Sequence, residues 1–232
     1  MSGWNVSRWL YVSIALSVIA LGTSLYVYAN RAELLEKEVP THWGIHGNPD
    51  KLTARDQMLP HLLILPGTMA ILTVMMVVLP WISPKRFGVE DFRDTFNYLM
   101  TVVVAMMAYL YAVMVTSYVH ADLVHNGTLD TGRLIVAGVF AFFAILGNQL
   151  GKVRRNFWMG VRTPWTLASE TVGTQTHRLA AWRFVAVGIV GFVAAVAEVP
   201  LAFCFGLLIA GALVPVVYSL VLYKRLEQAG KL

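Results

Sequence analysis

Apolar residues occur in long uninterrupted runs along this chain, and the segments between the runs carry nearly all of the charge. A helix rises about 1.5 Å per residue and the hydrocarbon core of a bilayer is about 30 Å thick, so a span needs roughly 17–25 apolar residues. The pattern predicts an all-α polytopic membrane protein with six transmembrane helices. The six windows that meet the requirement hold just over half of the chain: Leu10–Ala29, Pro60–Ile82, Asn97–Val119, Leu134–Leu150, Ala180–Ala197 and Leu201–Tyr223.

The composition supports this prediction. Hydrophobic residues make up 57% of the 232 residues and charged residues only 13%, whereas soluble domains have about 25% charged residues. Arg183 is the one charged residue inside a window, as expected when a charge at the bilayer centre costs several kcal/mol. A soluble globular protein is therefore excluded. The single cysteine, Cys204, excludes an intramolecular disulfide and a zinc site built from cysteines.

The distribution of basic residues predicts the orientation, because cytoplasmic loops are enriched in Lys and Arg. With six spans both termini lie on one side, and that side has 13 basic and 5 acidic residues against 5 and 8 on the other. We therefore expect both termini to be cytoplasmic, with net charges of +8 inside and −3 outside. The pI near 9.4 then reflects contact with anionic lipid headgroups, and we predict no nucleic-acid partner. The first window exceeds the core of a signal peptide, so we expect it to remain as a helix.

Two connecting segments are longer than turns require, residues 30–59 outside and residues 151–179 inside. Each has about 30 residues, fewer than the ~40 below which chains seldom fold unaided. We therefore expect both to fold against the helices, the bilayer or a partner, and we predict neither a soluble enzyme domain nor a cofactor. Residues 1–232 are treated as one membrane domain, in which residues 1–82 contain the outer segment and residues 83–232 contain the inner one.

The outer segment carries the first candidate functional residues. Residues 31–38 are predicted to extend the first span as a helix that Pro40 ends, and glycine, asparagine and proline then mark a compact turn. Two histidines and an aspartate follow one another at four-residue intervals, which on a helix is a common spacing for metal ligands, although the glycines and Pro49 disfavour a helix here. The candidates are His42, Trp43, His46, Asn48 and Asp50.

Three interpretations of the outer segment remain open. It is a purely structural turn, a surface that recognises an external ligand, or a metal site formed by His42, His46 and Asp50. A metalloprotease is excluded, because no glutamate follows the first histidine, and no nucleophile elbow, P-loop or dinucleotide fingerprint occurs. An enzyme is therefore not predicted.

The inner segment interleaves basic and aromatic residues. Such a segment suits the membrane interface, with aromatic rings at headgroup depth and cations on phosphates, or the docking of a cytoplasmic partner or an anionic ligand. Thr163 and Pro164 suit the N-cap and first residue of a helix, which we expect to run through residues 165–177 into the fifth span. The candidate binding residues are Asn148, Lys152, Arg154, Asn156, Arg162, Thr163, Pro164, Trp165, His177 and Arg178.

Polar groups at membrane depth are few. Transporters usually keep an ionisable group near the bilayer centre, whereas Asn148, Gln149 and Arg183 lie within about a turn of an interface. This disfavours a small-molecule or ion transporter but leaves it as the alternative function. We expect Asn148 and Gln149, which lie between Gly147 and Gly151, to hydrogen-bond a neighbouring helix at a close crossing.

The inner segment resembles the signature of the bacterial SdpI family, a Gly-Lys-x-Arg-x-Asn-(aromatic)-x-Gly-x-Arg-Thr-Pro-Trp-Thr-Leu stretch followed by Thr-His-Arg. Residues 151–167 read GKVRRNFWMGVRTPWTL and residues 176–178 read THR; Arg155 stands where the family commonly has proline. The stretch from Pro40 to Asp50 is similar to the Pro-x-His-Trp…Gly-x-Pro-Asp motif of the domain that commonly precedes this family's signature. Together with the six-span pattern, the resemblance covers nearly the whole chain.

The resemblance implies a multi-pass protein of the bacterial cytoplasmic membrane. The best-known member of the family confers immunity to a secreted killing peptide and signals by holding a transcriptional repressor at the membrane. By this resemblance we expect a non-enzymatic immunity or signal protein whose outer segment meets a peptide toxin or other ligand. The inner segment would then act on a repressor or another cytoplasmic protein. A metal-dependent membrane enzyme that uses His42, His46 and Asp50 is a third, weaker hypothesis.

Overall fold

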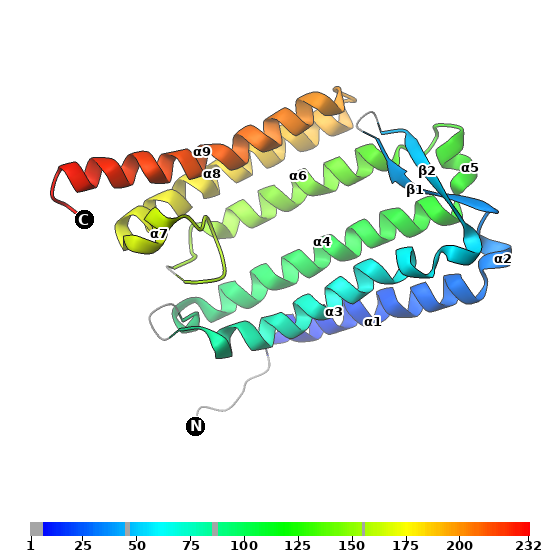
Figure 1. Ribbon diagram of the computed structural model, residues 1–232, viewed down its shortest axis with the longest axis horizontal. Coiled ribbons are helices and arrows are strands. Elements are labelled where there is room, and N and C mark those ends of the chain that lie inside the picture. Colours follow the sequence, from blue (N-terminus) through cyan, green and yellow to red (C-terminus); the bar gives the residue numbers. More distant parts are fainter. Residues whose placement is uncertain (1–6, 45–46, 85–87, 155) are drawn as a thin grey trace.

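The computed structural model describes residues 7–44, 47–84, 88–154 and 156–232, which form a bundle of long helices lying roughly side by side (Figure 1). Six helices in these ranges are long and apolar enough to cross a membrane. Each of them overlaps one predicted window almost completely, so the predicted all-α polytopic fold is confirmed. They are α1 (Arg8–Ala29), α3 (Leu59–Ile82), α4 (Arg93–Val119), α6 (Thr131–Leu150), α8 (Glu170–Val196) and α9 (Leu201–Gln228).

The outward faces of these helices are apolar. Ile19, Ile64 and Ile71 are each more than half exposed, and so are many other large apolar side chains on the helices. In water such a surface would be unfavourable, because burial of apolar area is the main stabilising contribution to folding. The helices therefore carry their apolar residues where lipid chains would contact them.

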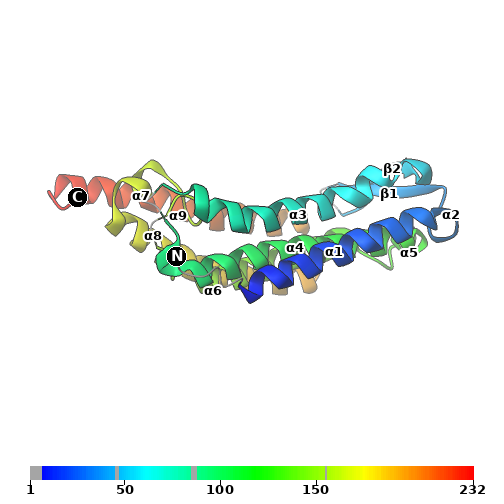
Figure 2. The ribbon, with the colours of Figure 1, turned by 90° about the horizontal axis from the view of Figure 1, so that it is seen from below.

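The first three spans pack against one another, and α3 covers the face formed by α1 and α4 (Figure 2). A stripe of small residues lies on the buried face of α1, at alternating spacings of four and three: Ser13, Ser17, Ala20, Ser24 and Val27. The Ser13 and Thr101 hydroxyls lie 3.1 Å apart, and Ser24 Oγ donates to the Leu62 carbonyl at 2.6 Å. Small residues let helices approach closely, and hydroxyls form hydrogen bonds between helices. This explains why this face of an otherwise apolar helix is the one that packs.

The last three spans form a second group, in which α6 and α8 pack closely. A Cβ added at Gly147 would lie only 2.8 Å from the Ala181 carbonyl oxygen, so this crossing requires glycine. The close crossing predicted beside Gly147 is therefore confirmed. The span α4 joins the two groups, because it packs against α6 as well as against α1 and α3. Its Ser117 hydroxyl lies 2.7 Å from that of Thr131 on α6.

The two long connecting segments lie at opposite ends of the bundle (Figure 1). One end, here called the hairpin end, consists of residues 30–58 with the α4–α6 and α8–α9 connections. The other, the loop end, consists of residues 151–178, which reach into the first turns of α8, together with the described residues between α3 and α4 (83–84 and 88–92), the start of α1 and the end of α9. The elements at the hairpin end are α2 (Arg31–Leu34), β1 (Glu38–Trp43), β2 (Pro49–Ala54), the 3-10 turn η1 (Arg55–Gln57) and α5 (Ala121–His125).

The hairpin itself was not predicted. The helix expected over residues 31–38 ends at Leu34, and β1 and β2 then pair as antiparallel strands, with Val39 opposite Thr53. Val39 is fully buried, and the Thr41 and Thr53 hydroxyls lie 2.8 Å apart across the strands. Charged residues had favoured a helix, but β-branched residues pack well on a pleated strand once the bundle offers a surface to cover.

The loop end contains the 3-10 turn η3 (Glu90–Phe92) and the short helix α7 (Pro164–Ala168). The predicted helix start is confirmed, because Thr163 Oγ1 accepts a hydrogen bond from the Thr166 amide and Pro164 is the first helical residue. The predicted continuation through residues 165–177 is wrong at one position. Ser169 is extended, with φ −127° and ψ 126°, and caps a new helix at Glu170, so the chain bends between α7 and α8.

Candidate functional site

At the hairpin end, the strands bring His42 and Asp50 together. His42 Nδ1 and Asp50 Oδ1 lie 2.5 Å apart, and the two side chains are 66% and 50% exposed. Asn48 is also exposed, and its carbonyl accepts a hydrogen bond from the Gly44 amide at 2.9 Å. Three of the predicted outer residues thus present polar atoms to the solvent beside one another, as a surface for an external ligand would require.

The metal hypothesis involved His46, which lies outside the described residues. Within the described ranges no group of three His, Cys, Asp or Glu side chains is arranged to hold a metal ion. His42 and Asp50 together supply two ligating side chains, fewer than the three or four typical of a zinc site.

Trp43 connects the hairpin to the helices. It is half-buried and packs against the apolar cluster that contains Val39, Leu62 and Tyr118. Together with α6 and α9 it also lines an apolar cavity of about 170 Å³ that reaches Cys204. An aromatic residue in this place gives the hairpin a fixed position on the bundle.

The tip of the hairpin rests on the first turn of α6. A Cβ at Gly132 would lie 2.8 Å from the Gly47 Cα, and Gly47 has φ +83°. Both positions therefore need glycine, one for close approach and one for its backbone conformation. The hairpin is held by backbone contact with α6 rather than by a flexible tether.

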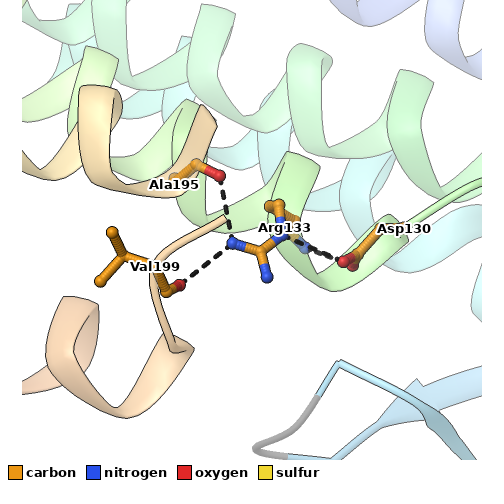
Figure 3. A network of polar contacts seen from close by, with 4 residues as sticks. All are labelled: Asp130, Arg133, Ala195 and Val199. Carbon is orange, nitrogen blue, oxygen red and sulfur yellow. Dashed lines mark hydrogen bonds and ion pairs between the residues drawn. The ribbon is translucent and has the colours of Figure 1, made fainter. Parts of the chain in front are cut away.

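An ion-pair network next to the hairpin tip was not predicted from the sequence (Figure 3). Asp130 caps α6 by accepting from the Arg133 amide at 2.8 Å and also pairs with the Arg133 guanidinium at 3.2 Å. Arg133 Nη1 in turn donates to the carbonyls of Ala195 and Val199, each at 3.1 Å. These bonds cross the predicted tight turn between α8 and α9, where Glu198 has φ +58°. The sequence signal that could have predicted this network is the Asp-x-x-Arg spacing of Asp130 and Arg133 at the start of a span.

At the loop end, Asn156 is fully buried and organises the loop backbone. Its amide nitrogen donates to the carbonyls of Arg154 and Met159, at 2.8 and 3.1 Å. Its oxygen accepts from the amides of Trp158 and Met159, at 2.6 and 2.7 Å. All four bonds remain within residues 154–159, so this predicted binding residue shapes the loop.

Thr163, Pro164 and Trp165 form the start of α7. The Thr163 hydroxyl also lies 3.0 Å from the Ser219 hydroxyl, which attaches the loop to α9. Trp165 is half-buried and Pro164 is exposed. Arg162 is half-buried and lines, with Thr163, a mostly apolar cavity of about 370 Å³ between the loop and the helices α4, α6, α8 and α9.

His177 is buried in α8 and holds the loop from the helix side. Its Nδ1 donates to the Val153 carbonyl at 3.2 Å. Gly160, with φ +97°, lies against the imidazole ring so closely that any Cβ there would overlap the ring. The histidine therefore fixes the two sides of the loop, at residues 153 and 160, to one point of α8.

Three predicted basic residues converge at the loop end. Lys152, Arg154 and Arg178 line one polar cavity of about 370 Å³, together with Asp91 of η3 and the threonine Thr95 of α4. All three cations are exposed, and none of them pairs with an acidic residue in the described part of the chain. The fold thus assembles a positively charged cavity from residues that the sequence had only suggested as neighbours.

The polar residues considered for a transport path lie elsewhere. Asn148 and Arg183 are exposed on the surface of the bundle. Neither they nor Gln149 line the three cavities at the hairpin and loop ends. The hydrogen bond expected from Asn148 or Gln149 to a neighbouring helix is not found among the described residues, because the backbones at Gly147 already meet directly.

Two comparisons with known proteins agree with this architecture. The profile of the SdpI/YfhL protein family matches residues 152–219, from the loop end into α9. The chain is also similar to the immunity protein SdpI of Bacillus subtilis (strain 168), with 26% identity over 180 residues, which is 77% of each chain. No solved structure gives a significant match.

The family profile covers residues 152–219 of this chain, whereas the similarity to SdpI covers 180 residues and so extends well beyond the profile match. Combined with six helices of membrane-spanning length, these matches support a multi-pass protein of the bacterial inner membrane. They do not separately identify the hairpin motif. Residues 152–219 thus match the SdpI/YfhL protein family, and a longer stretch of 180 residues is similar to one immunity protein.

Proposed function

We propose that this chain is a membrane immunity and signal protein. The hairpin end recognises an extracytoplasmic toxin peptide or other ligand. The loop end either relays ligand binding to a cytoplasmic partner or sequesters that partner. The observation that carries the proposal is the placement of the two motif-bearing segments at opposite ends of one bundle (Figure 1), in a chain similar to an immunity protein. The excess of basic residues at the loop end supports its cytoplasmic orientation.

The hairpin end suits recognition because its polar groups are exposed while its backbone is fixed. His42 and Asp50 lie on the solvent side of the strands, and Val39 and Gly47 hold the other side against the helices. A preorganised surface loses little conformational entropy on binding. The hairpin can therefore contribute its exposed polar pair to a ligand without first being ordered.

The loop end suits a protein partner for a related reason. Phe157 is 48% exposed and stacks edge-on against Trp158, which is itself tied to Ser83 at the end of α3 by a 2.7 Å hydrogen bond. An exposed aromatic side chain on a rigid loop, beside basic residues, is typical of a protein-binding surface. Such a surface would meet an apolar, acidic patch on the cytoplasmic partner.

The test is survival of a peptide-sensitive bacterial strain that expresses this protein and is challenged with a secreted killing peptide. We expect protection from the unaltered chain, and its loss in His42→Ala and Asp50→Asn. Glu36→Ala is the matched control, since Glu36 is an exposed polar residue at the same end but outside the His42–Asp50 pair. Equal survival with and without the protein, over a panel of such peptides, would refute the immunity role.

The signalling half has its own readout, the recovery of cytoplasmic proteins crosslinked to the chain with and without peptide. We expect peptide-dependent recovery of one partner, reduced by Phe157→Ala. Leu232→Ala removes a similarly exposed apolar side chain at the same end and should leave recovery unchanged. Recovery that does not depend on the peptide would remove the relay function and leave immunity alone.

A further inference from the structure

We propose that the cavity formed by Lys152, Arg154 and Arg178 binds a phosphate-bearing anion. Its source is either the headgroup of an anionic lipid or a free phosphate compound, since both present the same group. The cavity has a volume of about 370 Å³, which lies within the range of small-molecule sites and leaves room for the moiety that carries the phosphate. This site goes beyond the immunity role and does not depend on it.

The three cations converge because each is a chain neighbour of Val153 or His177, two buried residues joined by a hydrogen bond. Val153 is buried, and its neighbours Lys152 and Arg154 are both exposed. The Val153 carbonyl accepts the hydrogen bond from His177, which precedes Arg178 on α8. One contact between the loop and α8 therefore brings the charges on either side of Val153 next to the charge after His177. The convergence is a consequence of the fold rather than of flexible side chains meeting by chance.

The turn that carries Lys152 is itself rigid. The Lys152 amide donates to the Gln149 carbonyl at 3.0 Å, and the Val153 amide donates to the Leu150 carbonyl at 3.1 Å. These bonds continue the last turn of α6, so the backbone beneath the cavity is fixed before any ligand arrives. A preorganised set of donors binds an anion with a smaller loss of entropy.

The chemistry of the lining favours phosphate. Three cations face one carboxylate, Asp91, and the hydroxyls of Thr95 and Thr174 add neutral donors. Unpaired cations held close together repel one another, so a negatively charged phosphate group, whether a lipid phosphodiester or inorganic phosphate, would relieve that repulsion. Guanidinium groups bind phosphate oxygens in pairs and lysine supplies a point charge. A carboxylate ligand would satisfy fewer of these donors than the oxygens of a phosphate.

The experiment uses the full chain in nanodiscs of phosphatidylcholine, into which inorganic phosphate is titrated and followed by calorimetry. A second arm measures, by native mass spectrometry, the retention of phosphatidylglycerol relative to phosphatidylcholine in phosphate-free buffer. We expect saturable binding of at least one probe, and Arg178→Gln should weaken it about tenfold or more, the usual cost of losing one charged hydrogen-bond partner. Binding should also weaken as the salt concentration rises.

Two variants separate the site from general charge. Arg178→Lys keeps the cation and should retain most of the affinity. Arg225→Gln removes the same charge from an exposed position near the end of α9, outside the cavity, and should leave binding unchanged. Gel filtration and helical circular dichroism show whether each variant is folded, and an unfolded Arg178→Gln is replaced by Lys152→Gln.

The outcomes divide clearly. Binding of phosphatidylglycerol alone supports the site with a lipid headgroup as the source, and binding of inorganic phosphate supports it with a free phosphate compound. If neither probe binds the unaltered chain, or if Arg225→Gln weakens binding as much as Arg178→Gln, the proposal is overturned. None of these results depends on survival under peptide challenge, so the immunity role stands or falls separately.

Discussion

The two ends of the bundle use their polar residues in opposite ways. At the hairpin end, strand pairing and the apolar cluster around Val39 maintain the structure, while His42 and Asp50 remain exposed. At the loop end, buried Asn156 and His177 bond to the loop backbone and maintain the structure, and mainly the basic residues are left exposed. Within each motif, therefore, some residues are buried and hold the backbone in place, and others are exposed and make up the surface.

This contrast has a thermodynamic basis. A loop without regular secondary structure must satisfy its backbone amides and carbonyls with side chains, because a buried unpaired polar group costs about 1–3 kcal/mol. A hairpin satisfies most of them through its own ladder. The loop end therefore depends on a few buried polar side chains, whereas the hairpin end distributes its stability over strand pairing and apolar packing.

The largest expected effect comes from Asn156→Ala. The substitution removes four backbone hydrogen bonds and leaves buried partners unsatisfied, so the protein should lose about 3 kcal/mol of stability, measured as a lowered thermal midpoint in nanodiscs. Asn148→Ala is the matched control, because Asn148 is exposed and its side chain forms no hydrogen bond with another described residue. If the two variants have the same thermal midpoint, buried polar groups do not maintain the structure of the loop end.

A glycine pair gives the next effect. Gly160 and Gly127 both have positive φ, but only Gly160 lies against another group, the His177 ring. Alanine should cost about 1 kcal/mol at Gly127, from backbone strain alone, and at least about 2 kcal/mol at Gly160, because the ring must also move. The thermal midpoints measure the difference. Equal losses would show that the contact between the loop and His177 is dispensable.

Arg133→Met should have an intermediate effect, confined to the hairpin end. It removes two hydrogen bonds to the α8–α9 turn and the ion pair with Asp130, worth about 2 kcal/mol together. Amide hydrogen exchange should increase at residues 195–199 and remain unchanged in the loop end. Arg183→Met is the control, since Arg183 is exposed. Faster exchange at both ends would mean that the two ends are coupled through the bundle.

Features determined by neighbouring residues were predictable from the sequence. The six spans follow from apolar length alone, and the start of α7 follows from Thr163 and Pro164, whose capping chemistry acts within one turn. The hairpin and the break at Ser169 were missed, because strand pairing and chain bending depend on which surface lies nearby. The tight turn at Glu198 was expected, but the Arg133 contacts that span it connect residues more than 60 positions apart.

The candidate sites show the same division. Composition indicated a basic, aromatic inner segment and a polar outer one, and both prove to be clustered at the ends of the bundle. The sequence could not show that Asn156 and His177 are buried within the loop end while Lys152, Arg154 and Arg178 surround a cavity. That distinction depends on the bond between His177 and Val153, which is a tertiary contact.

The smallest expected change in stability is also the one with the greatest expected effect on the proposed function. His42 and Asp50 form an exposed pair, and exposed polar contacts contribute little even when both groups are charged, about 0–1 kcal/mol, so Asp50→Asn should shift the thermal midpoint only slightly. Under peptide challenge, however, this variant should lose protection, because it lacks the exposed carboxylate that we expect to contact the ligand. Thr41→Val provides the reverse control, since it breaks the cross-strand hydroxyl contact but leaves the exposed pair intact. If Asp50→Asn destabilised the protein more than Asn156→Ala, polar residues would have the same structural role at both ends. That result would contradict the proposal that the hairpin end is the recognition surface.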